Sequence, residues 1–237
     1  MEVTKSELMF PKLNREEIAV LSTFGNERST AKNEILFDSG DTNVPVFVVL
    51  DGGLEIVRVL KNGEPLVVSH GPGEFSGEVN LLLGGPSPVW AKTKEPSRLL
   101  KIKREDLLHI AGTHSLPSDV FLSAYLLRRA HSVSRMMGDL LLVGSNHSAG
   151  TLRVRAFLER NDCVYNYLDL DRDPAVQWLL GQFTVRPEEV PILICGGGIV
   201  LRNPSNALVA ASLEVKSRAV SSSLWDIEMG VFSVGRE

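Results

Sequence analysis

The second half of the chain alternates short apolar runs with amphipathic segments, and this order constrains the fold more than any other feature of the sequence. The run from Asp139 to Gly144 is typical of a buried strand, and the segment after it places Val154, Phe157 and Leu158 on one helical face. The pattern then predicts a strand at residues 164–169, a helix at 174–183 and a strand at 192–195. A short strand up to Leu201 and a final helix from about Asn203 to Leu213 follow. An α/β unit of βαβαβ order is therefore expected.

This unit resembles the thioredoxin fold, in its glutaredoxin branch. Val190-Pro191 precedes the third strand, where that family has a cis proline, and Gly197-Gly198 stands where the family's glycine pair approaches the thiol substrate. The family's two redox cysteines fall on Ser148 and Thr151. A thiolate at a helix N-terminus attacks disulfides, whereas a serine hydroxyl stays protonated without a neighbouring base, so the resemblance implies a groove that binds but does not exchange disulfides. The groove residues that it implies are Ser148, Thr151, Val190, Pro191, Gly197 and Gly198.

The chain has two cysteines, Cys163 and Cys195, and both lie in or beside predicted strands. A free cysteine in such a place commonly behaves as a small buried hydrophobe, and no Cys-x-x-Cys spacing activates either thiol. We therefore expect no catalytic residue. The alternative, a thiol-disulfide oxidoreductase component that uses Cys163 or Cys195, stays open.

Composition argues against several classes of protein. The net charge of -4 over 237 residues argues against bulk nucleic-acid binding, and no recognition helix for DNA is found. The N-terminus, Met1 to Glu7, lacks the apolar centre of a signal peptide, and no apolar run approaches membrane-spanning length. Two cysteines do not make the disulfide framework of a secreted protein. A cytoplasmic protein without a metal site is expected.

The first half of the chain has many short strands divided by turn signals, followed by two helices. A polar cap predicts a helix from Asn14 to Phe24, and Lys61-Asn62-Gly63-Glu64 is a strong hairpin signal. Strands are predicted at residues 34–37, 44–50, 54–60, 65–69 and 97–102, and helices at 104–111 and 117–137. The fold class is thus an all-β jelly-roll barrel with flanking helices, followed by the α/β thioredoxin-like unit.

Three stretches of this barrel resemble the cyclic nucleotide-binding domain of the Crp/Fnr type. They are Ser39 to Asp41, Phe47 to Ile56, and the phosphate-binding cassette Pro72 to Leu82. In that family, backbone N–H groups of the cassette hold the cyclic phosphate and its glutamate accepts a hydrogen bond from the ribose; Gly77 and Glu78 match those positions. The ligand-binding residues that the resemblance implies are Phe75, Gly77, Glu78, Val79, Pro88 and Val89.

The sequence departs from this family where an arginine normally pairs with the phosphate. That arginine, a small hydroxyl residue and an alanine are replaced by Pro88, Val89 and Trp90, and neither proline nor valine can supply a charge-assisted hydrogen bond. Two interpretations stay open. Another basic residue replaces the arginine in a genuine nucleotide site, or the barrel is degenerate and binds no ligand. The basic candidates are Arg58, Lys92, Lys94 and Arg128.

The helix predicted at 117–137 carries an apolar stripe, made of Val120, Phe121, Ala124, Leu127, Ala130 and Val133. The stripe predicts a homodimer through this helix. Packing of the helix on the barrel of the same chain would produce the same stripe.

The order of the two units resembles the N-terminal half of fused bacterial thioredoxin-disulfide reductases, which continue into an FAD- and NADPH-binding part. The resemblance covers residues 10 to about 213, while Lys216 to Glu237 has no Gly-x-Gly-x-x-Gly motif. We expect domains at 1–137 and 138–215 and a loosely ordered tail at 216–237. The resemblance implies a regulatory module, without cofactor other than a cyclic nucleotide, that acts with a thioredoxin-reductase-type flavoprotein or its substrate.

Overall fold

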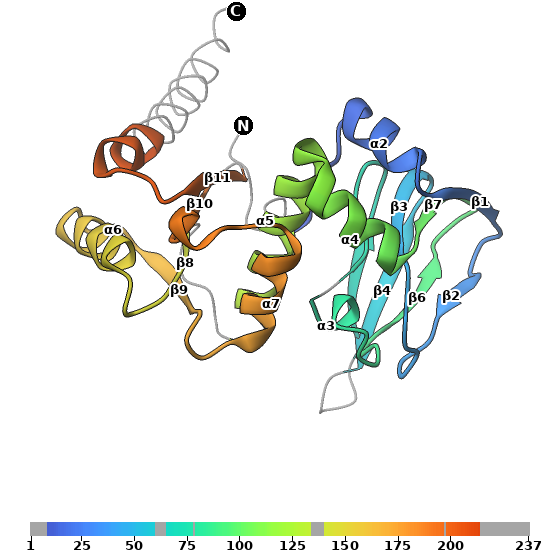
Figure 1. The fold of residues 1–237 in the computed structure, drawn as a ribbon. Helices are drawn as coiled ribbons and strands as arrows, with labels where there is room; N and C mark the ends of the chain where they lie inside the picture. The colour runs from blue at the N-terminus through green and yellow to red at the C-terminus, as the bar shows by residue number, and fades with distance from the viewer. Residues whose placement is uncertain (1–8, 60–64, 78, 134–139, 197, 214–237) are drawn as a thin grey trace, which may run out of the picture.

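The computed structural model describes residues 9–59, 65–77, 79–133, 140–196 and 198–213 of the chain (Figure 1). A β-barrel made by the first half lies on one side of the molecule and a smaller sheet from the second half on the other, with helices between them. The predicted hairpin turn at 61–64 and the tail at 216–237 lie outside the described residues.

The barrel consists of two antiparallel sheets. One has the order β1-β7-β3 and the other β2-β6-β4-β5. Apolar side chains between them form a cluster that includes Phe37, Phe47, Leu54 and Leu99. The bounds are β1 (Asn26–Thr30), β2 (Ile35–Phe37), β3 (Val46–Asp51), β4 (Leu54–Val59), β5 (Pro65–His70), β6 (Trp90–Thr93) and β7 (Ser97–Ile102).

Strands β1 and β6 were not expected from the sequence. β1 reads Asn-Glu-Arg-Ser-Thr, four of its five side chains are exposed, and it therefore shows no apolar alternation. It forms because its backbone pairs with the central strand β7, in a register that joins Asn26 to Lys101 and Thr30 to Ser97. Backbone pairing has no side-chain signature, so the sequence pattern missed it.

In the described part of the chain, four helices flank the barrel, namely α2 (Arg15–Ser22), α3 (Val79–Leu82), α4 (Arg104–Thr113) and α5 (Ser115–Val133). α2 begins at a capping box: the Glu17 N–H donates to Asn14 Oδ1 at 2.9 Å, and the Asn14 N–H donates to Glu17 Oε2 at 2.7 Å. α5 contacts α2, α3 and α4 on the barrel side, and α7 and β9 on the other.

The position of α5 decides between the two interpretations of its apolar stripe. Every side chain from Phe121 to Arg128 is buried, because the barrel covers one face of the helix and the second unit covers another. Of the residues of the stripe, Val133 at the end of the helix is the most exposed, at 51%. The stripe therefore packs within the chain and offers no apolar seam to a second copy between Phe121 and Arg128, contrary to the homodimer predicted through helix 117–137.

The second sheet has the order β11-β10-β8-β9, in which β8 and β9 are parallel and the other pairs antiparallel. Its elements lie within one or two residues of the predicted ranges, except that the last helix begins at residue 206. Asn203 has a φ of 40°, and Ser205 Oγ caps the helix by accepting from the Leu208 N–H at 3.2 Å. The bounds are β8 (Leu140–Gly144), α6 (Ala149–Arg160), β9 (Tyr165–Asp169), α7 (Pro174–Gln182), β10 (Ile192–Cys195) and β11 (Ile199–Arg202).

The two units share one apolar core. A single cluster of buried side chains runs from Val48 in the barrel through Tyr125 on α5 to Phe183 and Ile194 beyond it. Two ion pairs join the units at either end of α5. Arg129 binds the carboxylate of Asp173 through two nitrogens, at 2.8 and 3.2 Å, and Arg202 Nη2 lies 2.6 Å from Asp119 Oδ1. The second unit is thus held on the helix that also closes the barrel.

Candidate functional site

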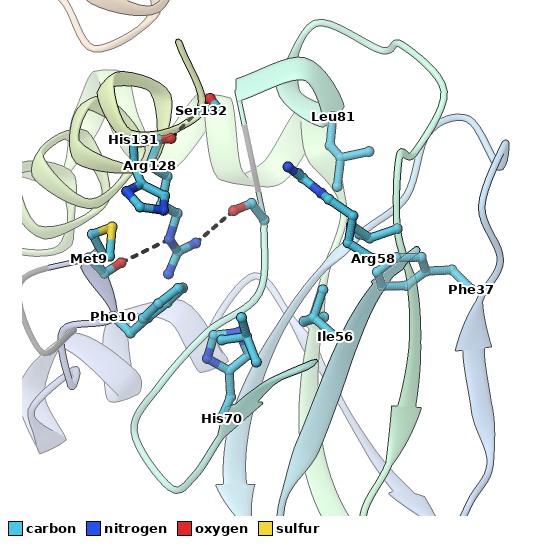
Figure 2. Close-up of a pocket in the computed structure, with 13 residues that line it drawn as sticks. Met9, Phe10, Phe37, Ile56, Arg58, His70, Leu81, Arg128, His131 and Ser132 are labelled. Carbon is cyan, nitrogen blue, oxygen red and sulfur yellow. Dashed lines mark hydrogen bonds between the residues drawn. The ribbon is translucent and has the colours of Figure 1, made fainter. Parts of the chain in front are cut away.

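A cavity of about 370 Å³ lies between the inner face of the barrel, the cassette and α5 (Figure 2). Strands β2, β4 and β5 form one wall, and the end of α5 together with the N-terminal segment forms the opposite one. This volume falls within the roughly 300–1,000 Å³ typical of small-molecule sites. The lining residues are Met9, Phe10, Phe37, Ile56, Arg58, Val68, His70, Gly77, Leu81, Val89, Arg128, His131 and Ser132.

The cassette is held tightly by the barrel and by α5. Phe75 is fully buried, and its ring centroid lies 4.4 Å from that of Phe121. Ser76, which follows Phe75, is held in place by the Phe47 N–H, which donates to its Oγ at 2.9 Å. Gly77 has a φ of +122°, and a Cβ there would lie 2.9 Å from Tyr125 Oη, so only glycine fits without rearrangement.

Arg128 on α5 binds the cassette through its guanidinium. Nη1 donates to the Gly77 carbonyl at 2.7 Å, Nη2 to the Phe75 carbonyl at 3.1 Å, and Nε to the Met9 carbonyl at 2.9 Å. The guanidinium carbon also lies 4.9 Å from the ring centroid of Phe10 and 4.8 Å from that of Phe75. The Arg128 side chain therefore links α5, the cassette and the N-terminal segment through hydrogen bonds, while its charge faces the cavity.

Arg58 enters the cavity from the opposite wall. Side chains alternate along β4, so that Leu54, Ile56 and Arg58 share the face that points into the barrel. Figure 2 shows the Arg58 side chain passing below Leu81 of α3 with its nitrogen end directed toward the side from which Arg128 approaches. A guanidinium thus stands in a row that is otherwise apolar.

His70, at the end of β5, is the least exposed of the polar side chains that line the cavity, at 3%. Burial lowers its pKa below the ordinary 6.5, and the nearby Arg128 charge acts in the same direction. Its Nδ1 lies 3.7 Å from Glu74 Oε2, beyond hydrogen-bond distance, and has no hydrogen-bond partner among the described residues. Burial acts to raise the pKa of Glu74, but its interaction with His70 and the hydrogen bond from the Gly71 N–H bring that pKa below 4.5.

The ligand-binding residues predicted from the sequence are only partly brought together. Gly77 and Val89 line the cavity, Phe75 packs in the core beside it, and Pro88 is exposed. Val79 begins α3, and Glu78 lies outside the described residues. No sequence pattern indicated His70, Phe10 or His131 as lining residues, since their place depends on how β5, the N-terminal segment and α5 meet. Arg58 did leave a signal, a charge at an inward-facing strand position.

The predicted groove of the second unit is arranged differently from expectation at one residue. Ser148 caps α6, with its Oγ 3.5 Å from the Thr151 N–H, but Thr151 is fully buried and its Oγ1 has no partner among the described residues. A Cβ on Gly144 would lie 2.4 Å from that oxygen, so Thr151 packs on β8 and does not face a groove.

Two of the other predicted groove residues, Val190 and Pro191, lie against the start of α6. The Val190-Pro191 peptide bond is cis, and a Cβ on Gly150 would lie 2.9 Å from Pro191 Cδ. Gly198 is half-buried with a φ of +77°, and Gly197 lies outside the described residues. The proline loop therefore packs directly on the first turn of α6.

Both cysteines lie in the second unit, and neither is in a disulfide. Cys195 is 2% exposed at the end of β10, and Cys163 is half-buried against the same apolar cluster, with its Sγ 3.5 Å from the Asn161 carbonyl oxygen. Over the described ranges, no group of three or more His, Cys, Asp or Glu side chains is placed to hold a metal ion. In the described part of the chain, no helix has the length and apolar character needed to cross a membrane.

Comparison with known proteins agrees with the barrel. A sequence model described as the cyclic nucleotide-binding domain matches residues 27–114, which include most of β1, all of β2 to β7, and helices α3 and α4. Residues 27–114 are thus similar to a cyclic nucleotide-binding domain. The match ends before α5, so it contains neither the helix that closes the cavity nor the second sheet.

Proteins that are similar to this chain include bacterial regulators. The cyclic AMP receptor protein of Thermus thermophilus is 28% identical over 138 residues, which are 58% of this chain and 63% of that protein. The chain therefore spans less than two thirds of this relative. Among solved structures, the catabolite activator protein of Thermus thermophilus is 25% identical, with a TM-score of 0.44 over 55% of this chain and 60% of that one. The N-terminal domain of a transcriptional regulator from Streptomyces coelicolor is 25% identical, with a TM-score of 0.40 over 59% and 99% of the two chains.

Proposed function

We propose that the chain is a non-catalytic regulatory module whose cyclic nucleotide-binding domain takes an anionic ligand of the cyclic nucleotide class. Its second unit is a thioredoxin-like domain without a nucleophile, which docks on a thioredoxin-reductase-type flavoprotein or on the substrate of that enzyme.

The charge of the cavity carries the first part of the proposal. Arg58 and Arg128 approach the cavity from opposite walls, and none of the described lining residues is acidic. Apolar walls with low dielectric strengthen the attraction of such a site for an anion. A mononucleotide with one negative charge and a flat base suits a cavity that is basic at two points and otherwise apolar.

The topology of the second sheet supports the second part. The order β9-β8-β10-β11, with one parallel and two antiparallel pairs and with α6 between β8 and β9, is the arrangement that the resemblance to the glutaredoxin branch implies. Ser148 caps α6 where that family carries its nucleophilic thiol. A hydroxyl there can accept the helix N–H but does not attack a disulfide, so the surface around Pro191 serves for docking.

Calorimetric titration of the purified chain with cyclic AMP and with cyclic GMP at physiological salt tests the ligand. We expect saturable heat with one of them and its loss in Glu78→Ala, while Glu95→Ala, at an exposed carboxylate outside the cavity lining, serves as the matched control. Absence of heat with both nucleotides would overturn this part of the proposal.

NADPH-dependent reduction of a small disulfide by a purified thioredoxin reductase, with and without the chain, tests the partner. We expect the chain alone to show no turnover and the rate of the reductase to change when the chain is added. Turnover by the chain alone that is lost on replacing Cys163 or Cys195 would instead establish the thiol-dependent alternative.

A further inference from the structure

We propose that His70, at the end of β5, determines the specificity of the cavity by hydrogen-bonding an exocyclic amino or oxo group of a purine base. This inference rests on the proposed function and deepens it, because it names the side chain that distinguishes one base from another. The observation behind it is a buried imidazole that lines the cavity and whose Nδ1 has no hydrogen-bond partner among the described residues.

His70 faces the cavity because of its position in β5. Val68 and His70 line the cavity, whereas Val67 and Ser69 are exposed, as the alternation of side chains along a strand requires. Val68 pairs across the sheet with Ile56 of β4, which also lines the cavity. A polar ring therefore stands beside apolar side chains in this wall.

The burial of His70 has a cost that a ligand can remove. Its side chain is 3% exposed, and Glu74 Oε2 lies 3.7 Å from Nδ1, beyond hydrogen-bond distance. That carboxylate oxygen instead accepts the Gly71 N–H at 2.9 Å. A buried polar atom without a partner costs free energy, so a ligand that supplies the partner gains affinity.

The protonation state of His70 suits the polar edge of a base. Burial is the chief cause that lowers the pKa of His70 below 6.5, and the Arg128 charge acts in the same direction, so the ring is neutral at pH 7.5. A neutral imidazole carries one N–H donor and one acceptor nitrogen. It therefore accepts from an exocyclic amino group or donates to an exocyclic oxo group, and these are the groups in which adenine and guanine differ.

Planar groups of the N-terminal segment and of α5 lie beside the imidazole (Figure 2). The ring centroids of Phe10 and His70 are 5.1 Å apart, and the guanidinium carbon of Arg128 lies 4.9 Å from the Phe10 centroid. Bases stack favourably on aromatic rings and on guanidinium planes. This part of the cavity therefore suits a flat base.

Three other polar side chains that line the cavity on the α5 side are placed for different tasks. His131 and Ser132 are exposed, and the Ser132 hydroxyl donates to the carbonyls of Arg128 and Arg129 at 3.1 and 2.9 Å. The Arg128 guanidinium donates to three backbone carbonyls and so positions the cassette. His70 is therefore better placed than these three to recognise a base.

Calorimetry at pH 7.5 with three ligands tests the inference. The ligands are cyclic AMP, cyclic GMP and the cyclic monophosphate of purine riboside, whose base lacks exocyclic groups. His70→Phe and His70→Leu remove both ring nitrogens and keep an apolar side chain in the wall, and urea unfolding verifies that the variants fold. His147→Phe is the control, since the His147 side chain is 89% exposed and lies in the second unit.

In the unmodified chain, we expect the nucleotide that binds to do so about 10-fold more tightly than the purine riboside analogue, as for one hydrogen bond to a buried group. His70→Phe and His70→Leu should weaken binding of that nucleotide about 10-fold and leave binding of the analogue unchanged, so that the two ligands bind equally. His147→Phe should keep the difference between them.

Two results would overturn the inference and leave the proposed function standing. One is a preference for the nucleotide over the analogue that persists in the His70 variants, and the other is equal affinity for both ligands in the unmodified chain. Absence of binding of all three ligands to the unmodified chain would overturn the proposed cyclic nucleotide site, and this inference with it.

Discussion

The ion pair between Arg129 and Asp173 allows a quantitative test of how the two units hold together. The carboxylate has two tasks: it receives Arg129 at 2.8 and 3.2 Å, and its Oδ1 caps α7 by accepting the N–H groups of Ala175 at 3.1 Å and Val176 at 3.3 Å. Asp173→Ala removes both interactions, and Asp173→Asn removes the charge while keeping a good N-cap.

The magnitude follows from these two contributions. Loss of an N-cap costs about 1 kcal/mol. The side chains of Arg129 and Asp173 are 24% and 10% exposed, so the bidentate pair lies between a surface and a buried one, and we assign it about 1–2 kcal/mol. We therefore expect the free energy of unfolding to fall by about 2–3 kcal/mol in Asp173→Ala and by about 1–2 kcal/mol in Asp173→Asn.

Urea unfolding at pH 7 provides the assay, because the shared apolar core favours a single transition for both units. A double-mutant cycle of Arg129→Met with Asp173→Asn isolates the pair from the cap. A loss below about 0.5 kcal/mol in Asp173→Ala, which is the scatter of ordinary surface substitutions, would refute the reasoning. So would equal losses in Asp173→Ala and Asp173→Asn, since the cap would then contribute nothing.

Three further outcomes are expected. Gly77→Ala should lower the free energy of unfolding by about 2–4 kcal/mol, because the cost of a positive φ and the cost of crowding against α5 add. Gly40, with a φ of +95° and no atom within 4 Å, is the control, and Gly40→Ala should lower it by only about 1 kcal/mol. Equal losses of the two variants in urea unfolding would contradict the crowding argument. The unfolded chain binds a proton at His70 more readily than the folded chain, so stability should fall as the pH drops below 6.5. The urea midpoints at pH 7.5 and pH 5.5 should therefore differ less in His70→Asn than in the unmodified chain or in the control His147→Asn. Ser148→Cys should place a thiol at the start of α6 with a pKa below about 8.5, as read from thiolate absorbance; a value at or above 8.5 would argue against that geometry.

Local pattern accounts for most of the elements. The apolar runs at 140–144 and 192–195 have the length and composition of buried strands wherever they pack, and Asn14 with Glu17 forms the capping box expected at the start of α2. Where the chain forms structure without a side-chain signature, as in β1, the pattern failed, because the backbone of a central strand recruits an edge strand irrespective of its sequence.

The candidate site was predictable only in part. Gly77 and Val89 followed from the motif, whereas His70 and Phe10 enter the cavity because β5 and the N-terminal segment meet there. Arg58 was one of four basic candidates, and its strand register is what directs it inward.

The sequence alone thus determined most of the segments that become strands and helices and that no redox thiol stands at the start of α6, because periodicity, caps and residue identity are local properties. Only the tertiary structure decided that Arg58 lines the cavity while Arg128 fastens the cassette, and that the stripe of α5 is covered within the chain. These depend on contacts between segments far apart in the chain, whose partners and distances arise when the barrel and the second sheet pack on opposite faces of one helix.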